Sequence, residues 1–167
     1  MRLLIQRVTE GRCRIEGEVY SQIGKGLVVF VGIGNDETEE DIAWLTKKLV
    51  QLRIFDDSEG VMNLSVQDIA GEVMIVSQFT LHAMTKKGNR PSWIKAAPEA
   101  ISRPLYEAFV RSVEQALGHT VATGSFGADM QIELTNSGPV TIWIDPVKHT
   151  IINSAAIKRK LNAFFIL

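Results

Sequence analysis

Polar side chains follow an apolar run in the middle of the chain, in a place that suits substrate binding. Residues 73–76 are apolar, and Ser77, Gln78, Phe79 and Thr80 come directly after them. Backbone N–H groups and hydroxyls at the end of a strand can polarise a carbonyl group, as an oxyanion hole does. A strand end that simply becomes solvated would have the same composition. Residues 77–80 are therefore a candidate catalytic segment.

A Gly-Pro dipeptide, Gly138–Pro139, stands between two alternating segments near the end of the chain. Proline cannot donate to a sheet ladder and glycine weakens a strand, so a hairpin turn is one interpretation. An X–Pro bond is also the place where a cis peptide costs little, about 0.5–1 kcal/mol. A cis bond here would bring backbone carbonyls close to a ligand from a rigid element.

The third candidate is a basic segment, residues 82–98, which contains no acidic residue although the net charge of the chain is −1. Lys86, Lys87 and Arg90 lie in it, and Trp93 follows. Basic loops with an aromatic residue suit phosphate contact and base stacking. A solvated loop is the alternative. The near-neutral chain as a whole is unlike a protein that coats nucleic acid non-specifically.

Conventional catalytic and metal-binding sets are missing from the sequence. The histidines, His82, His119 and His149, are scattered and lack the spacing of metal ligands. The single cysteine, Cys13, excludes an internal disulfide and a four-cysteine zinc site. No Gly-x-Ser-x-Gly motif occurs, and no glycine-rich loop has the spacing of a nucleotide site. We therefore expect no metal and no cofactor.

Two helices must position these candidates. Residues 35–55 show apolar positions three and four apart after Thr38, which can cap the helix and is followed by acidic residues. A second helix is predicted from Pro98, with apolar residues at steps of four and a stop at Gly118.

The remaining segments predict strands, at residues 3–8, 12–20, 27–33, 71–81, 130–135 and 140–145. Three strands, a helix, a strand, a helix and closing strands indicate an α+β fold with a largely antiparallel sheet rather than alternating βαβ units. Residues 1–146 are expected to form one domain, and residues 147–167 a C-terminal extension of unknown role, with an amphipathic helix or a frayed end at 155–165. No signal peptide or membrane span is apparent, so a cytoplasmic location is expected.

Taken together, these segments resemble the D-aminoacyl-tRNA deacylase family. The resemblance covers about residues 1–146 and rests on four motifs in the family's order: Ser-Gln-Phe-Thr-Leu at 77–81, the basic loop at 86–92, Gly-Ser-Phe-Gly-Ala-Asp-Met at 124–130, and Asn-Ser-Gly-Pro-Val-Thr at 136–141. Met84 departs from the pattern, because an aspartate is common there; no role of that carboxylate is carried over.

The resemblance implies a homodimeric editing enzyme with a β-sandwich or barrel-like core flanked by helices. Members hydrolyse the ester between a D-amino acid and the 3′ end of tRNA and also remove mischarged glycine. They need no metal, and their catalysis rests on main-chain groups and the terminal 2′-hydroxyl of the tRNA. No membrane or DNA partner is expected.

Lys86, Lys87 and Arg90 are the candidate tRNA contacts. Carried over by position, the resemblance assigns three further groups of residues. The catalytic segment is Ser77, Gln78, Phe79 and Thr80. The substrate pocket is lined by Phe126, Gly127, Ala128 and Met130. The bond between Gly138 and Pro139 is expected to be cis, and this pair is expected to enter the partner subunit's site and exclude L-amino acids.

Three alternatives remain open from the residues alone. A tRNA-binding module without activity would need neither Thr80 nor the Gly-Pro pair. A small-molecule ester or amide hydrolase could use Ser77 or Thr80 as nucleophile, with His82 as the base nearest in sequence. Ser77 and His82 are too far apart on an extended segment for contact without a bend. A purely structural sheet protein would need none of the motifs.

Overall fold

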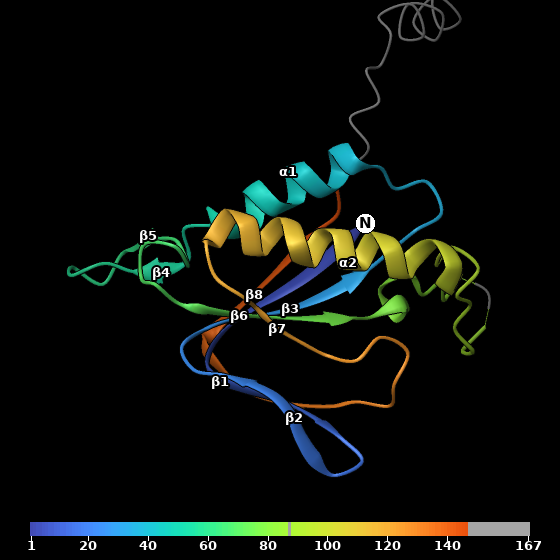
Figure 1. Cartoon of the computed structure of the whole chain (residues 1–167), viewed down its shortest axis with the longest axis horizontal. Helices are drawn as coiled ribbons and strands as arrows, with labels where there is room; N and C mark the ends of the chain where they lie inside the picture. Colours follow the sequence, from blue (N-terminus) through green and yellow to red (C-terminus); the bar gives the residue numbers. More distant parts are fainter. Residues whose placement is uncertain (87, 147–167) are drawn as a thin grey trace, which may run out of the picture.

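The chain begins with three strands, and two helices and the remaining strands follow (Figure 1). The computed structural model describes residues 1–86 and 88–146, so Lys87 and the expected extension at 147–167 lie outside the described residues. In chain order the elements are β1 (Arg2–Ile15), β2 (Glu18–Ile23), β3 (Gly26–Gly32), α1 (Glu39–Val50), β4 (Phe55–Asp56), β5 (Met62–Leu64), β6 (Glu72–Ser77), the 3₁₀ turn η1 (Phe79–His82), α2 (Glu99–Leu117), β7 (Ala122–Thr123) and β8 (Gln131–Ile144).

The long strand β1 organises the main sheet, because it pairs antiparallel with β2, β3 and β8. Its first half lies between β3 and β8, and its second half lies between β2 and β8. The sheet order is β2-β1-β3-β6-β7, with β8 on β1, which makes the sheet barrel-like. The predicted α+β class with a mostly antiparallel sheet and two flanking helices is confirmed.

Two strand pairs are parallel, however: β3 with β6, and β6 with β7. Parallel neighbours need a crossover connection, and α1 and α2 lie in these two crossovers. The exclusion of βαβ units is therefore wrong for this part of the chain. Figure 1 shows α1 and α2 side by side over one face of the sheet, and a hydrogen bond of 2.9 Å joins Thr46 to Ser112 between them.

Both helices begin and end where local chemistry predicts, with one exception. Thr38 caps α1 and forms a reciprocal capping box with Asp41. α2 ends at Gly118, which takes a left-handed conformation. The exception is the end of α1, which stops at Val50 rather than at Phe55.

The core has two parts, one on each face of β3. Leu27, Val29 and Val31 pack toward the helices, and Val28 packs with Cys13 in a smaller cluster enclosed by the curled sheet. A strand that is buried on both faces has a continuous apolar run rather than an alternating one, as residues 27–31 do.

Three predictions of strand boundaries are wrong. The strand predicted at residues 12–20 is interrupted by a turn at residues 16–17, so its first part belongs to β1 and its last part to β2. The strand predicted at residues 71–81 ends at Ser77, which pairs with Val31 near the end of β3. The chain then turns into η1, which packs directly on Gly32: a Cβ there would lie 2.9 Å from the Cβ of Leu81. The two strands predicted at 130–135 and 140–145 are the single strand β8, so Gly138–Pro139 is not a hairpin turn.

None of the helices in the described residues is long and apolar enough to cross a membrane.

His82 gives the fold a pH dependence. Its side chain is buried at the end of η1, and among the described residues no partner is found for its Nε2. Burial lowers the pKa of His82 below its usual 6.5, so the unfolded chain takes up a proton at a higher pH than the folded protein does. His82 therefore contributes stability above pH 6.5 that is lost as the pH falls toward its lowered pKa.

We expect the free energy of unfolding to fall by at most about 1.4 kcal/mol per pH unit from this group in that window. His82→Gln should flatten the dependence, as measured by urea unfolding between about pH 5 and about pH 7. If the free energy of unfolding depends on pH in the same way in the variant and the wild type, His82 is not the source of the pH dependence.

Candidate active site

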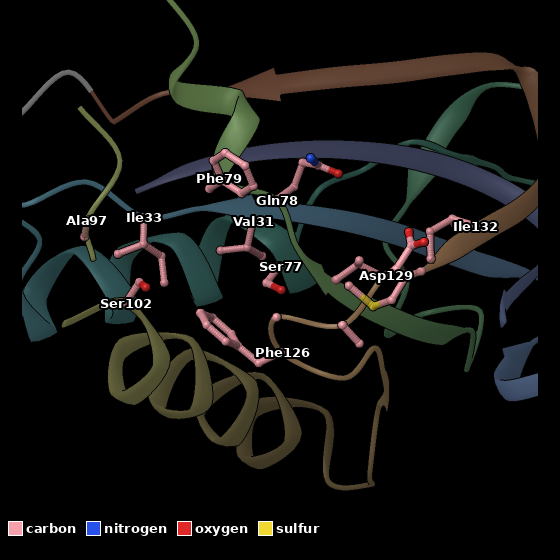
Figure 2. Close-up of a pocket in the computed structure, with 14 residues that line it drawn as sticks. Val31, Ile33, Ser77, Gln78, Phe79, Ala97, Ser102, Phe126, Asp129 and Ile132 are labelled. Atoms are coloured by element: carbon pink, nitrogen blue, oxygen red, sulfur yellow. The ribbon is translucent and has the colours of Figure 1, made fainter. Parts of the chain in front are cut away.

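A cavity of about 300 Å³ opens at the carboxyl ends of the parallel strands β3 and β6 (Figure 2). This edge of parallel strands is where α/β proteins commonly bind ligands. Its walls come from β3, the end of β6, the start of α2 and the loop before β8. The lining residues are Val31, Ile33, Val76, Ser77, Gln78, Phe79, Ala97, Ser102, Phe126, Gly127, Ala128, Asp129, Met130 and Ile132.

The candidate catalytic segment forms one wall of this cavity. Ser77, Gln78 and Phe79 line it, and the backbone N–H of Gln78 donates to the carbonyl of Val31 at 2.7 Å. Thr80 does not line the cavity; its hydroxyl accepts a hydrogen bond from Nε2 of Gln78. The hydroxyl of Thr80 therefore positions the Gln78 amide.

The opposite wall is the loop that the sequence identifies as the substrate pocket. Phe126, Gly127, Ala128 and Met130 all line the cavity, and their role in binding stays a prediction. Figure 2 shows Phe126 entering from the side of α2, opposite Phe79 and Gln78. Its ring packs on Tyr106, and the guanidinium of Arg103 lies 4.9 Å from its centroid.

Ionisable groups are scarce in this cavity. Among the described residues that line it, Asp129 is the only ionisable side chain. His82 lines a different cavity, beside Met1 and Arg2. Within the part of the chain that the structure describes, the cavity therefore has no histidine that could serve a nucleophile at Ser77. Within the described part of the chain, no group of three or more histidine, cysteine, aspartate or glutamate residues could hold a metal ion.

The Gly-Pro pair lies in a bulge of β8. Gln6 pairs with Thr141 and Val8 pairs with Asn136, so residues 137–140 stand out from the ladder. The Gly138–Pro139 bond is cis, as predicted. Both residues are exposed, and neither lines the cavity of its own chain.

Two side chains hold this bulge in place. The side-chain oxygen of Asn136 accepts from the backbone N–H of Val140 at 2.8 Å. Arg7, which is 9% exposed, donates from Nε to the carbonyl of Ser137 at 3.0 Å. Its Nη1 donates to the carbonyl of Ile54 at 2.6 Å. Gly138 has a φ of +122°, and a Cβ there would lie 2.8 Å from Nη2 of Arg7 and 2.9 Å from Cγ2 of Val140, so glycine suits this position best.

No role was predicted for Arg7, whose hydrogen bonds support the bulge. A signal was available, because Leu3 and Ile5 alternate onto the buried face of β1 and Arg7 falls on the same face. A cation at such a position is costly unless it is paired and hydrogen-bonded. The pattern does not predict the hydrogen-bond partners of Arg7, because they belong to segments that are distant in sequence.

The basic segment follows η1 as a closed loop. Met84 and Ser92 exchange two backbone hydrogen bonds, of 2.9 and 3.0 Å, across its neck. Lys86 and Arg90 are exposed within it, and Lys87 lies outside the described residues. Beyond the neck, Trp93 contacts Phe79, with ring centroids 5.4 Å apart. The loop is thus attached to the mouth of the cavity.

Fold and site together define a small α+β protein with a cavity at a parallel strand edge, lined by backbone, hydroxyl and amide groups rather than by a catalytic triad. The family model described as D-Tyr-tRNA(Tyr) deacylase matches residues 4–145. The chain belongs to this family, which confirms the identification made from its motifs.

Relatives and solved structures agree. The chain is 57% identical over 145 residues to a D-aminoacyl-tRNA deacylase of Bacteroides thetaiotaomicron, and 59% identical over 145 residues to one of Parabacteroides distasonis. Each match covers 87% of this chain and 97% of the relative.

A solved c-Myc DNA unwinding element binding protein is 34% identical, with a TM-score of 0.82 over 87% of this chain and 98% of that one. A probable eukaryotic D-amino acid tRNA deacylase, 20% identical, shares the fold with a TM-score of 0.76 over 86% and 98% of the two chains.

Arg7→Met should destabilise the protein and loosen the bulge, because it leaves the carbonyls of Ser137 and Ile54 without their donor. We expect a loss of about 1–3 kcal/mol in the free energy of unfolding and faster amide exchange at Val140. The control is Arg12→Met, an exposed arginine on the same strand, for which a change within about 0.5 kcal/mol is expected. Equal effects of the two substitutions would show that Arg7 does not support the bulge.

Proposed function

We propose that this protein is an editing hydrolase that cleaves the ester of D-aminoacyl-tRNA, and of tRNA mischarged with glycine, and releases the free amino acid and tRNA. The observation that carries the proposal is the meeting of residues 77–79 with the 126–130 loop around one cavity, in a chain of the D-Tyr-tRNA(Tyr) deacylase family. Because its substrate is used in translation, we place the activity in the cytoplasm.

The reaction needs orientation more than a strong base. Water attacks the ester carbonyl carbon, the bond to the ribose oxygen breaks, and that oxygen leaves as the 3′-hydroxyl of the tRNA. The leading N–H groups of a helical turn have no acceptor within the turn. Gln78, at the N-cap of η1, makes no side-chain capping bond, so the amide of Phe79, which lines the cavity, is suited to hold the oxyanion.

We assign activation of the water to the terminal 2′-hydroxyl of the tRNA. The support is chemical: the cavity lining in the described residues has no histidine and no pair of ionisable side chains. A hydroxyl next to the scissile ester is held at high effective concentration by the substrate itself.

The Gly138–Pro139 bulge is the proposed gate against L-amino acids. Because the pair is exposed and does not line its own cavity, a gating role requires a second copy of the chain. We therefore propose a homodimer in which each bulge enters the partner subunit's cavity. The apolar side chains of β8 support this arrangement: Ile132 and Leu134 pack against one core cluster and Val140, Ile142 and Ile144 against the other, yet all five are only half-buried in the single chain.

A backbone gate suits the discrimination required. Apolar pockets separate similar side chains by only about 1–3 kcal/mol per methylene. A fixed wall of carbonyls rejects the whole L-series by collision, whatever the side chain, provided that the wall does not yield. The bonds from Arg7 and Asn136 to the bulge give it that stiffness.

The main test is ester hydrolysis of matched D- and L-aminoacyl-tRNA by the wild-type protein. We expect the D-ester to be cleaved and the L-ester to be spared. Binding of the D-ester without cleavage would favour the alternative, a tRNA-binding module without catalytic activity. Equal cleavage of both esters would refute the gate.

A tRNA that ends in 2′-deoxyadenosine extends the same assay to the mechanism. If the 2′-hydroxyl activates the water, the D-ester of this tRNA should bind normally and be cleaved several orders of magnitude more slowly. Unchanged cleavage would assign the activation to the protein.

Lys86 and Arg90 are proposed to contact tRNA phosphates, since both are exposed in the acid-free loop at the mouth of the cavity. Replacing both by glutamine should weaken tRNA binding and reduce its log–log salt slope by up to about 2 units, or somewhat less than one for each contact. The control is Lys47→Gln with Lys48→Gln, on the exposed side of α1. If the slope changes as little as in this control, Lys86 and Arg90 do not contact tRNA phosphates.

A further inference from the structure

Two aromatic side chains lie in solvent at the mouth of the cavity. Phe79 is 55% exposed and Trp93 is 38% exposed. Their rings meet edge to face, with centroids 5.4 Å apart and planes at 80°. Phe79 also lines the cavity, so the pair extends the cavity wall onto the surface. Neither ring belongs to either core cluster, so packing of the described chain does not explain their position.

Backbone hydrogen bonds on both sides hold Trp93 in place. The reciprocal bonds between Met84 and Ser92 end immediately before it. Its own carbonyl accepts from the N–H of Ala96 at 2.8 Å, and Ala97 donates to the carbonyl of Ile33, the residue after β3, at 2.9 Å. The tryptophan therefore stands on a segment fixed to the end of the sheet, and little freedom is lost when a ligand covers it.

The charge along the segment that carries Trp93 favours an anionic partner. Residues 82–98 contain no acidic side chain, and Lys86, Arg90 and Lys95 are exposed along them. Flat apolar rings beside exposed cations are the combination that binds single-stranded nucleic acid, with bases on the rings and phosphates on the cations.

We propose that the Phe79–Trp93 pair is a stacking platform for the unpaired 3′ end of tRNA, and that it holds the base of a nucleotide immediately before the terminal adenosine. The inference rests on the proposed function, which puts the terminal aminoacyl-adenosine in the cavity. A strand that leaves the cavity past Phe79 reaches Trp93 next, and its phosphates then face the basic segment. The platform gives the enzyme affinity for tRNA over a single aminoacyl-nucleoside.

The test compares two substrates that carry the same D-amino acid, namely D-aminoacyl-tRNA and the D-aminoacyl ester of adenosine. For each variant, the measured quantity is the ratio of kcat/KM for the tRNA to kcat/KM for the adenosine ester. Trp93→Ala should lower this ratio by about 5-fold to 100-fold, chiefly through KM for the tRNA. Trp93→Phe, which keeps a ring, should restore most of it.

The matched control is Trp143→Ala, which removes another exposed tryptophan, on β8 and outside the cavity lining. It should leave the ratio as in the wild type. An unchanged ratio in Trp93→Ala, or an equal loss with both substrates, would overturn the platform. A shift of Trp93→Ala to a smaller species in sedimentation, with the ratio unchanged, would instead assign the pair to a contact between copies of the chain.

A binding measurement keeps this inference separate from the proposed function. An RNA oligonucleotide that ends in the CCA sequence of tRNA is titrated into the Trp143→Ala protein, and tryptophan fluorescence is followed. Quenching that is lost in the protein carrying both Trp93→Phe and Trp143→Ala supports stacking on Trp93, even if the wild type cleaves neither ester. Binding of the oligonucleotide without quenching overturns the platform while leaving the hydrolase proposal intact.

Discussion

The parallel pairing of β3 with β6 is the constraint on which the candidate site depends. Parallel strands end at the same edge, so the backbone of Val31 and the polar residues after Ser77 come together there. The pairing also forces a crossover, which brings α1 over the sheet and leaves room for α2 beside it. After Ser77, which pairs with Val31, the chain leaves the ladder and turns tightly over Gly32, the last residue of β3. The cavity wall therefore forms where β6 stops pairing and η1 begins.

A second constraint acts at the bulge, and it is electrostatic. Arg7 is a buried cation on β1, and its guanidinium joins the carbonyls of Ser137 and Ile54, which belong to segments far apart in sequence. A planar guanidinium offers five N–H donors in a fixed fork, whereas the ammonium of a lysine is a compact charge on a flexible stem. Burial makes each bond hard to break, because a lost partner leaves a desolvated charge. The same atoms that satisfy the charge therefore stiffen the backbone that the proposed gate requires.

Features that depend on residues close together in sequence could be predicted, and features that depend on distant residues could not. The cap at Thr38 and the stop at Gly118 depend on neighbours within a few residues, and both were predicted. Motif resemblance likewise identified the cavity-lining residues at 77–79 and 126–130. The parallel pairs and the partners of Arg7 depend on contacts across more than forty residues, as the 47-residue separation between Arg7 and Ile54 illustrates. The alternation of apolar and polar residues along one strand does not indicate which distant segments will pair with it. The single strand β8 was divided in two because Gly-Pro marks a turn locally, whereas β1 continues to pair beyond the bulge.

The scarcity of ionisable groups in the cavity and the stiffness of the bulge have a common explanation in the proposed reaction. An aminoacyl ester next to a ribose hydroxyl is already reactive, so a strong protein base would add rate without adding selectivity. Selectivity must come from shape, and a flexible side chain would yield to the wrong enantiomer. A backbone wall avoids this, but it has to be held by side chains that are themselves immobile, as Arg7 and Asn136 are. In the proposed function, the fold places its buried hydrogen bonds behind the proposed gate and leaves the reacting centre to backbone amides and to the substrate itself.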